Sequence, residues 1–133
     1  MRTYALRLRP GQDLRQELVR FADSTGLQAG VVLTCVGSLD EAVIRLADQP
    51  EATLFSGKFE IVSLVGTLSP DGPHLHIALA DSSGRTLGGH LMAGCKVYTT
   101  AEIALADLTD WRFAREDDPQ TTYKELRVYP KAP

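Results

Sequence analysis

The segment Gly72–Leu91 constrains the fold of this chain most strongly, because two alternating stretches are joined there by a loop of recognisable type. The loop Asp81-Ser82-Ser83-Gly84 has Asp at the first position of a type I turn and Gly where a left-handed residue is needed. This pattern predicts a three-residue hairpin loop with a glycine bulge, which pairs Asp81 with Arg85. A slip of one residue would move every side chain of a strand to the other face, so the loop fixes the register.

The three histidines of the chain fall on one face of this predicted hairpin. His74 and His76 are two residues apart on one strand and therefore point to the same side. The loop places His76 directly opposite His90, where paired Cβ atoms lie about 4.5–5.5 Å apart. The same register pairs Leu79 with Leu87, Leu75 with Leu91 and Ala78 with Gly88, which leaves space beside the imidazoles. One face is thus predicted to be apolar and the other to carry the imidazoles.

This arrangement favours a metal site formed by His74, His76 and His90. Three protein ligands plus water make the open type of zinc site, so a divalent transition metal, with zinc first, is the predicted cofactor. Neutral imidazole also suits iron, nickel, cobalt and copper. The alternative is three polar side chains on a solvated or interface face, titrating near pH 6.5.

Glu60 is a further candidate, because it lies on the preceding strand. A turn centred on Asp71 gives Glu60 the parity of the histidine face but places it towards the far end of the hairpin. We therefore expect at most a contact outside the ligand set, or a contribution to a neighbouring subunit. An exposed surface carboxylate is the alternative.

Elsewhere the pattern predicts one helix at about 13–25, with Asp13 as N-cap and Gly26 as the left-handed stop. The other predicted elements are strands, and no internal repeat or linker is visible, so residues 1–133 are expected to form a single α+β domain. The predicted strands outside the hairpin are 4–9, 30–36, 42–47, 59–68, 96–105, 111–115 and 126–129.

The composition narrows the classes of partner. A net charge of -3 and the absence of a basic run argue against a broad attraction to nucleic acid. No apolar stretch reaches the length of a membrane span. Cys35 and Cys95 lie in apolar segments and are expected to be buried, reduced thiols. The N-terminal residues show no signal-peptide pattern, so a cytoplasmic location is expected.

The sequence resembles the plants-and-prokaryotes conserved (PPC) domain family over most of its length. The resemblance is carried by Gly57–Leu68, which is similar to the Gly-Arg-Phe-Glu-Ile-Leu motif of plant members, by Gly88-Gly89-His90, and by the helix followed by Val32–Leu39. The two histidine strands resemble the bacterial and archaeal members. The resemblance implies a homotrimer of subunits, each a mostly antiparallel sheet with one helix packed on it.

Three functions are compatible with the resemblance. The first is a trimeric metal-binding module with a regulatory or interaction role. The second is a small metal-dependent enzyme of lyase or hydrolase type, by analogy with acetolactate decarboxylase-like folds, with Glu60 or a neighbouring subunit supplying acid–base help. The third is DNA binding, which the family label implies, although this sequence lacks the Arg-Gly-Arg-Pro arm of plant members.

Overall fold

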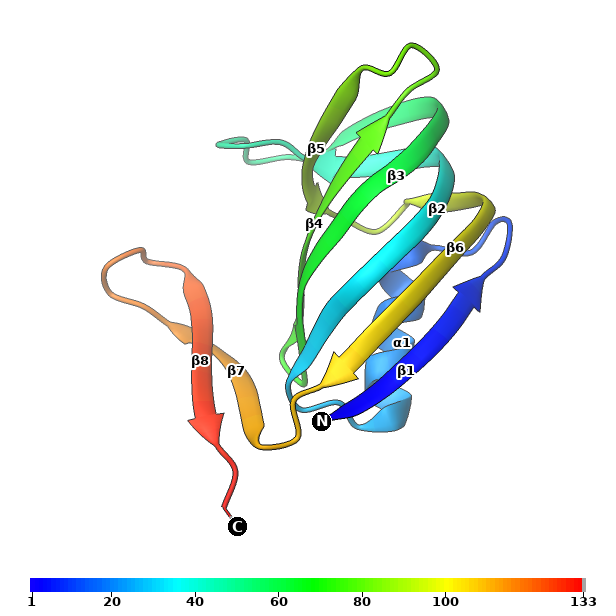
Figure 1. Cartoon of the computed structure of the whole chain (residues 1–133). Coiled ribbons are helices and arrows are strands. Elements are labelled where there is room, and N and C mark those ends of the chain that lie inside the picture. The colour runs from blue at the N-terminus through cyan, green and yellow to red at the C-terminus, as the bar shows by residue number, and fades with distance from the viewer. Residues whose placement is uncertain (133) are drawn as a thin grey trace.

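A computed structural model describes residues 1–132, which form eight strands and one helix (Figure 1). The elements in chain order are β1 (Arg2–Leu8), α1 (Leu14–Thr25), β2 (Gly30–Arg45), β3 (Thr53–Ser69), β4 (Gly72–Ala80), β5 (Thr86–Leu91), β6 (Lys96–Asp107), β7 (Trp111–Asp117) and β8 (Lys124–Pro130). The predicted fold class, a mostly antiparallel sheet with one main helix, is confirmed.

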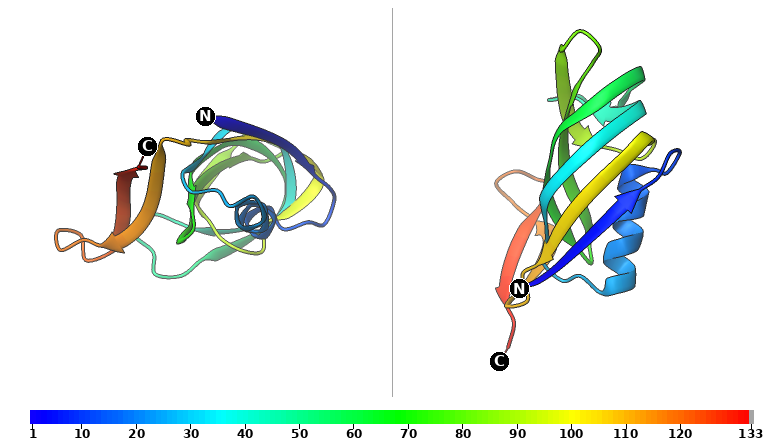
Figure 2. Two further views of the ribbon diagram at one scale, coloured as in Figure 1. Left: turned by 90° about the horizontal axis from the view of Figure 1, so that it is seen from below. Right: turned by 45° about the vertical axis from the view of Figure 1, so that its right-hand side comes forward.

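Six strands form one antiparallel sheet in the order β1-β6-β2-β3-β4-β5. The sheet is so strongly curved that its β5 edge returns to the end of β2, where Ile44 pairs with Leu91 and Arg45 pairs with His90. Viewed along the helix axis, the strands wrap around α1 (Figure 2, left). The β2–β5 pairing brings the second half of β2 to the histidine hairpin.

The helix begins and ends where the sequence predicts. The Asp13 side chain accepts a hydrogen bond from the backbone N–H of Gln16 at 3.0 Å, and Gly26 adopts the left-handed conformation with φ 69°. Leu14, Leu18 and Ala22 are buried against the concave face of the sheet. The amphipathic stripe of α1 therefore supplies one wall of the single core cluster.

Two predicted strand boundaries are wrong. The chain does not leave the sheet at Gly37-Ser38: β2 continues from Gly30 to Arg45, with irregularities in its pairing that bend it. Gly37 is needed there because a Cβ would collide with the backbone of Thr100 on β6. Likewise β3 begins at Thr53 and not at Phe59, because the second half of β2 offers it a partner. Gly37 therefore marks a close approach between strands and not a strand end.

The β7–β8 hairpin forms a separate two-stranded sheet that extends from the main body (Figure 1). Its contacts with the main body include two backbone donors: the Phe113 N–H donates to the Gln28 carbonyl at 2.9 Å, and the Arg115 N–H donates to the Asp71 carboxylate at 2.9 Å. The second contact joins the hairpin to the β3–β4 turn.

Among residues 1–132, no helix has the length and apolar character that a membrane crossing requires.

Candidate metal centre

The β4–β5 loop has the predicted chemistry. Gly84 has φ 82°, its N–H donates to the Asp81 carbonyl at 2.9 Å, and the Asp81 N–H donates to the Arg85 carbonyl at 2.9 Å. The Asp81 carboxylate also accepts from the N–H groups of Ser83 and Arg85, at 2.9 and 3.0 Å. Hydrogen bonds from the side chain and the backbone of Ser83 hold the pKa of Asp81 below its usual value. The loop is therefore closed by its own residues and fixes the register of the strands that enter it.

That register places the histidines as predicted. His76 lies opposite His90, Ala78 opposite Gly88, and Leu79 opposite Leu87. Leu75, Ile77 and Leu79 are buried in the core, whereas His74 and His76 are exposed and His90 is half-buried. The alternation along β4 therefore separates the core from the face that carries the imidazoles.

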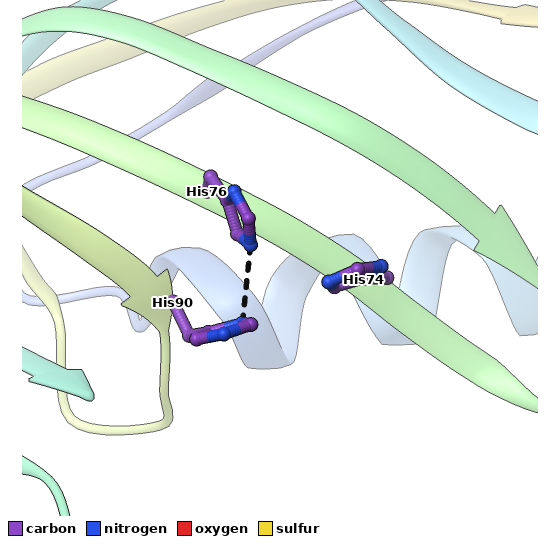
Figure 3. Close-up of side chains that lie close together, drawn as sticks. All are labelled: His74, His76 and His90. Carbon is purple, nitrogen blue, oxygen red and sulfur yellow. Dashed lines mark hydrogen bonds between the residues drawn. The ribbon is translucent and has the colours of Figure 1, made fainter. Parts of the chain in front are cut away.

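The three rings converge at one point above this face (Figure 3). One nitrogen from each of His74, His76 and His90 lies within 4.8 Å of the others. Nε2 of His76 is 3.2 Å from Nδ1 of His90. The ring centroid of His74 is 5.0 Å from that of His76 and 5.5 Å from that of His90. Figure 3 shows the His76 and His90 rings directed at each other, with His74 beside them on β4.

The environment of His74 and His90 favours their neutral forms. Burial, followed by the positive charge of Arg115, lowers the pKa of His74 below its ordinary value of 6.5, while the Glu125 carboxylate opposes this. Burial, followed by the charge of Arg45, lowers the pKa of His90. His74 and His90 therefore favour the neutral form, and an unprotonated imidazole nitrogen is the form that binds metals.

The donor set fits a divalent transition metal. Nitrogens that lie up to 4.8 Å apart need only small side-chain rotations to reach about 2.0–2.1 Å from a common ion. Because His74 and His76 are exposed, an ion held there would remain accessible to water or another ligand. His74, His76 and His90 are the residues that would hold such an ion.

Glu60 lies on the same face of the sheet but not with the histidines. A pairing irregularity between Ile61 and Ser63 sets Glu60 opposite Ala80. His76 is four residues away from Ala80 along β4, which corresponds to roughly 13 Å at the usual rise of a strand. Glu60 lines a different hollow of about 420 Å³ together with Lys58 and Tyr98. Within one chain, the structure does not bring Glu60 to the imidazoles.

Two arginines next to the histidines were missed by sequence reasoning. Arg45 comes from the end of β2 and Arg115 from β7, 70 positions apart in the numbering of the chain. Neither belongs to a recognisable motif, and only the β2–β5 closure and the position of the β7–β8 hairpin bring them to the site. No signal in the sequence could have found them.

The chain belongs to the Plants and Prokaryotes Conserved domain family, whose model matches residues 1–109. The predicted family resemblance is therefore confirmed. Residues 110–133, which include the β7–β8 hairpin, lie outside the matched range.

The chain is similar to part of each of two longer proteins. The chain is 59% identical over 128 residues to a bifunctional GlmU protein of Synechococcus sp. strain JA-3-3Ab, with 96% of the chain aligned, but spans only 21% of that protein's length. It is 31% identical to AT-hook motif nuclear-localized protein 2 of Arabidopsis thaliana, over 83% of the chain and 35% of that protein.

Two solved structures resemble it over nearly their whole length. A hypothetical protein from Salmonella cholerae-suis has 40% identity and a TM-score of 0.97, covering 98% of this chain and 95% of its own. A metal-containing protein from Archaeoglobus fulgidus has 28% identity and a TM-score of 0.80, covering 96% of this chain and 94% of its own.

Proposed function

We propose that this chain is a homotrimeric module that binds one divalent transition metal ion per subunit through His74, His76 and His90, and that it has a regulatory or interaction role. The observation that carries the proposal is the convergence of one nitrogen from each ring to within 4.8 Å. The metal-containing description of the Archaeoglobus relative supports it. Zinc is the first candidate, because three imidazoles with room for a further ligand are a usual donor set for that ion.

Metal content tests the site directly. Protein purified without an affinity tag should contain about one equivalent of metal, and His76→Ala should lose it, because two histidines cannot retain an ion that three hold. Loss of a direct ligand should weaken metal affinity by more than the roughly 10–100-fold that follows removal of an outer hydrogen-bond partner. Glu60→Gln is the matched control on the same face and should keep the wild-type content. Equal metal in wild type and His76→Ala would contradict the proposal.

A metal-dependent enzyme is the second candidate. It is favoured by a hollow of about 470 Å³ beside His74 and His76, to which the β7–β8 hairpin contributes Arg115 and Glu125. A bound ion would polarise a carbonyl or activate water there. Glu60 remains a candidate for acid–base help only from a neighbouring subunit. Turnover that disappears in His76→Ala and in Glu125→Gln, with metal retained in the second variant, would establish this activity.

The homotrimer is part of the proposal and is supported by an uncovered apolar surface. Leu33 and Val36 on β2, and Val62 and Val65 on β3, are each more than half exposed. Association of subunits would remove such side chains from water, which stabilises an oligomer. Light scattering should give the mass of three chains, and Val36→Asp should lower it. A monomeric wild type would contradict the proposal.

DNA is a weaker candidate partner, suggested by the AT-hook description of the Arabidopsis relative. The net charge of -3 provides no general attraction to phosphates. A salt series decides this: specific binding must weaken steeply between about 50 and 200 mM salt.

We also propose a cytoplasmic location, since Cys35 and Cys95 are buried and free.

A further inference from the structure

Two guanidinium groups are attached to the sheet directly beside the proposed metal ligands. Arg45 pairs with His90 across β2 and β5, so their side chains share one face. Thr67 pairs with His74 across β3 and β4, and the Thr67 hydroxyl accepts a hydrogen bond from Nη2 of Arg115 at 2.8 Å. The three histidines His74, His76 and His90, called the histidine triad below, are thus flanked by a cation from β2 and a cation from β7.

Neither arginine has a carboxylate partner within residues 1–132. The ion pairs of this part of the chain are formed by other residues, namely Arg20–Glu17, Lys96–Asp13, Lys124–Asp117 and Arg127–Glu116. Arg45 makes only a long contact of 3.5 Å to the Gln49 carbonyl, and the Arg115 side chain contacts a neutral hydroxyl. Both arginines are half-buried.

The space between these groups has the size of a small-molecule site. A hollow of about 560 Å³ is lined by Arg45, Arg115, His74 and His90, within the usual range of about 300–1,000 Å³ for ligand pockets. Asp48 and Glu125 also line it, but Arg15 and Lys124 add further positive charge, so cations outnumber carboxylates. Lys124 is 3.2 Å from Asp117, which leaves the three arginines as the cations without an ionic partner among the described residues.

An ion at the triad would increase this excess of positive charge. Neutral imidazoles do not compensate the charge of a divalent metal, and the nearby guanidiniums would repel it. An anionic ligand resolves the conflict, because one oxygen can occupy the open metal position while another accepts the paired N–H donors of a guanidinium.

From this geometry we infer that the site binds a small organic oxyanion, a carboxylate or a phosphate group, between the metal and Arg45 and Arg115. The inference rests on the proposed metal site. It names the class of ligand or substrate that the site selects and assigns Arg45 and Arg115 as the groups that select it.

Titration of the cobalt-loaded protein tests the inference, because the visible spectrum of Co²⁺ reports ligand binding without any activity assay. Oxalate, inorganic phosphate and neutral imidazole are the probes. Oxalate or phosphate should bind wild type, and Arg45→Gln should weaken that binding roughly tenfold, as expected for loss of a charge-assisted hydrogen bond. Imidazole should bind both proteins equally. Arg127→Gln is the matched control, because it removes a guanidinium of β8 that is paired with Glu116 of β7. This variant should bind the anions like wild type.

Arg115 also holds β7 against β3, so Arg115→Lys is the safer variant: it keeps the charge and removes the fork that pairs with two oxygens. It should weaken oxalate binding while metal content stays at the wild-type level. The stronger of the two anionic probes identifies the headgroup as carboxylate or phosphate.

The outcomes separate this inference from the proposed function. A wild type without stoichiometric metal overturns both. Full metal content with anion affinities that are unchanged in Arg45→Gln and Arg115→Lys overturns the inference alone, as does a preference of the loaded protein for imidazole over both anions.

Discussion

Nε2 of His76 lies 3.2 Å from Nδ1 of His90, on two strands joined by the Asp81–Gly84 loop. At this distance one nitrogen donates and the other accepts, so the pair is satisfied only while at least one of the two rings is neutral. A second proton would place two N–H groups against each other. The register of the hairpin therefore disfavours simultaneous protonation of both rings.

Acidification should release the metal and destabilise the metal-free protein. The pKa values of His74 and His90 are lowered by burial and then by nearby positive charge, so the unfolded chain takes up protons at a higher pH than the folded chain. Stability is therefore full above about pH 6.5 and falls as the pH drops through the lowered values. Urea unfolding between pH 7.5 and 5 measures this.

The double variant His74→Asn/His90→Asn is the control for that experiment, because it removes both shifted groups. Its stability should vary less over the same range. An equally steep dependence in wild type and variant would show that other groups cause it.

Gly66→Ala should destabilise the fold and disturb the site. Gly66 has φ 143°, and a Cβ there would collide with the backbone carbonyl of His74. Gly72 also has a positive φ, of 115°, but no atom lies within 4 Å of its Cβ position, so Gly72→Ala is the matched control. The collision should cost about 1–3 kcal/mol beyond the control, measured by urea unfolding. Similar losses in both variants would mean that backbone strain alone is responsible.

Asp13→Ala should cost about 2–4 kcal/mol of unfolding free energy, because one buried carboxylate serves two elements. Its Oδ1 accepts from the Gln16 N–H at 3.0 Å and caps α1, while its Oδ2 accepts from the Gly94 N–H at 2.6 Å in the loop before β6. Asp13→Asn retains one acceptor and should lose about half as much in the same urea experiment. Equal stability of the two variants would show that only one of the contacts contributes.

The two thiols should be inert in the folded protein. Burial raises the pKa of Cys35 and of Cys95 to about 11, so neither is a thiolate at pH 8. Because the ordinary value is 9.0, the protonated thiols contribute stability below pH 9 that is lost as the pH rises through 11.

A thiol reagent at pH 8 should therefore label them only at the rate of unfolding. A cysteine placed in the exposed β4–β5 loop by Ser82→Cys should react at once. Rapid labelling of the wild type would contradict the burial of Cys35 and Cys95.

Sequence patterns alone predict the hairpin, the convergence of its histidines and the single helix. These depend on short-range rules: alternation along a strand, a loop whose Asp and Gly fix its geometry, and caps at Asp13 and Gly26. These contacts join residues within about 20 positions of one another in the sequence, so they can be predicted without the rest of the fold.

The surroundings of the site depend on long-range packing. The sequence does not predict the full length of β2, because Gly37 marks a close approach of β6, which no local pattern distinguishes from a strand end. Arg45 reaches His90 through the curvature that joins β2 to β5, and Arg115 reaches Thr67 because β7 packs on β3. Such contacts are set by the packing of the curved sheet around α1, and the sum of many weak, distant interactions leaves no signature near either residue.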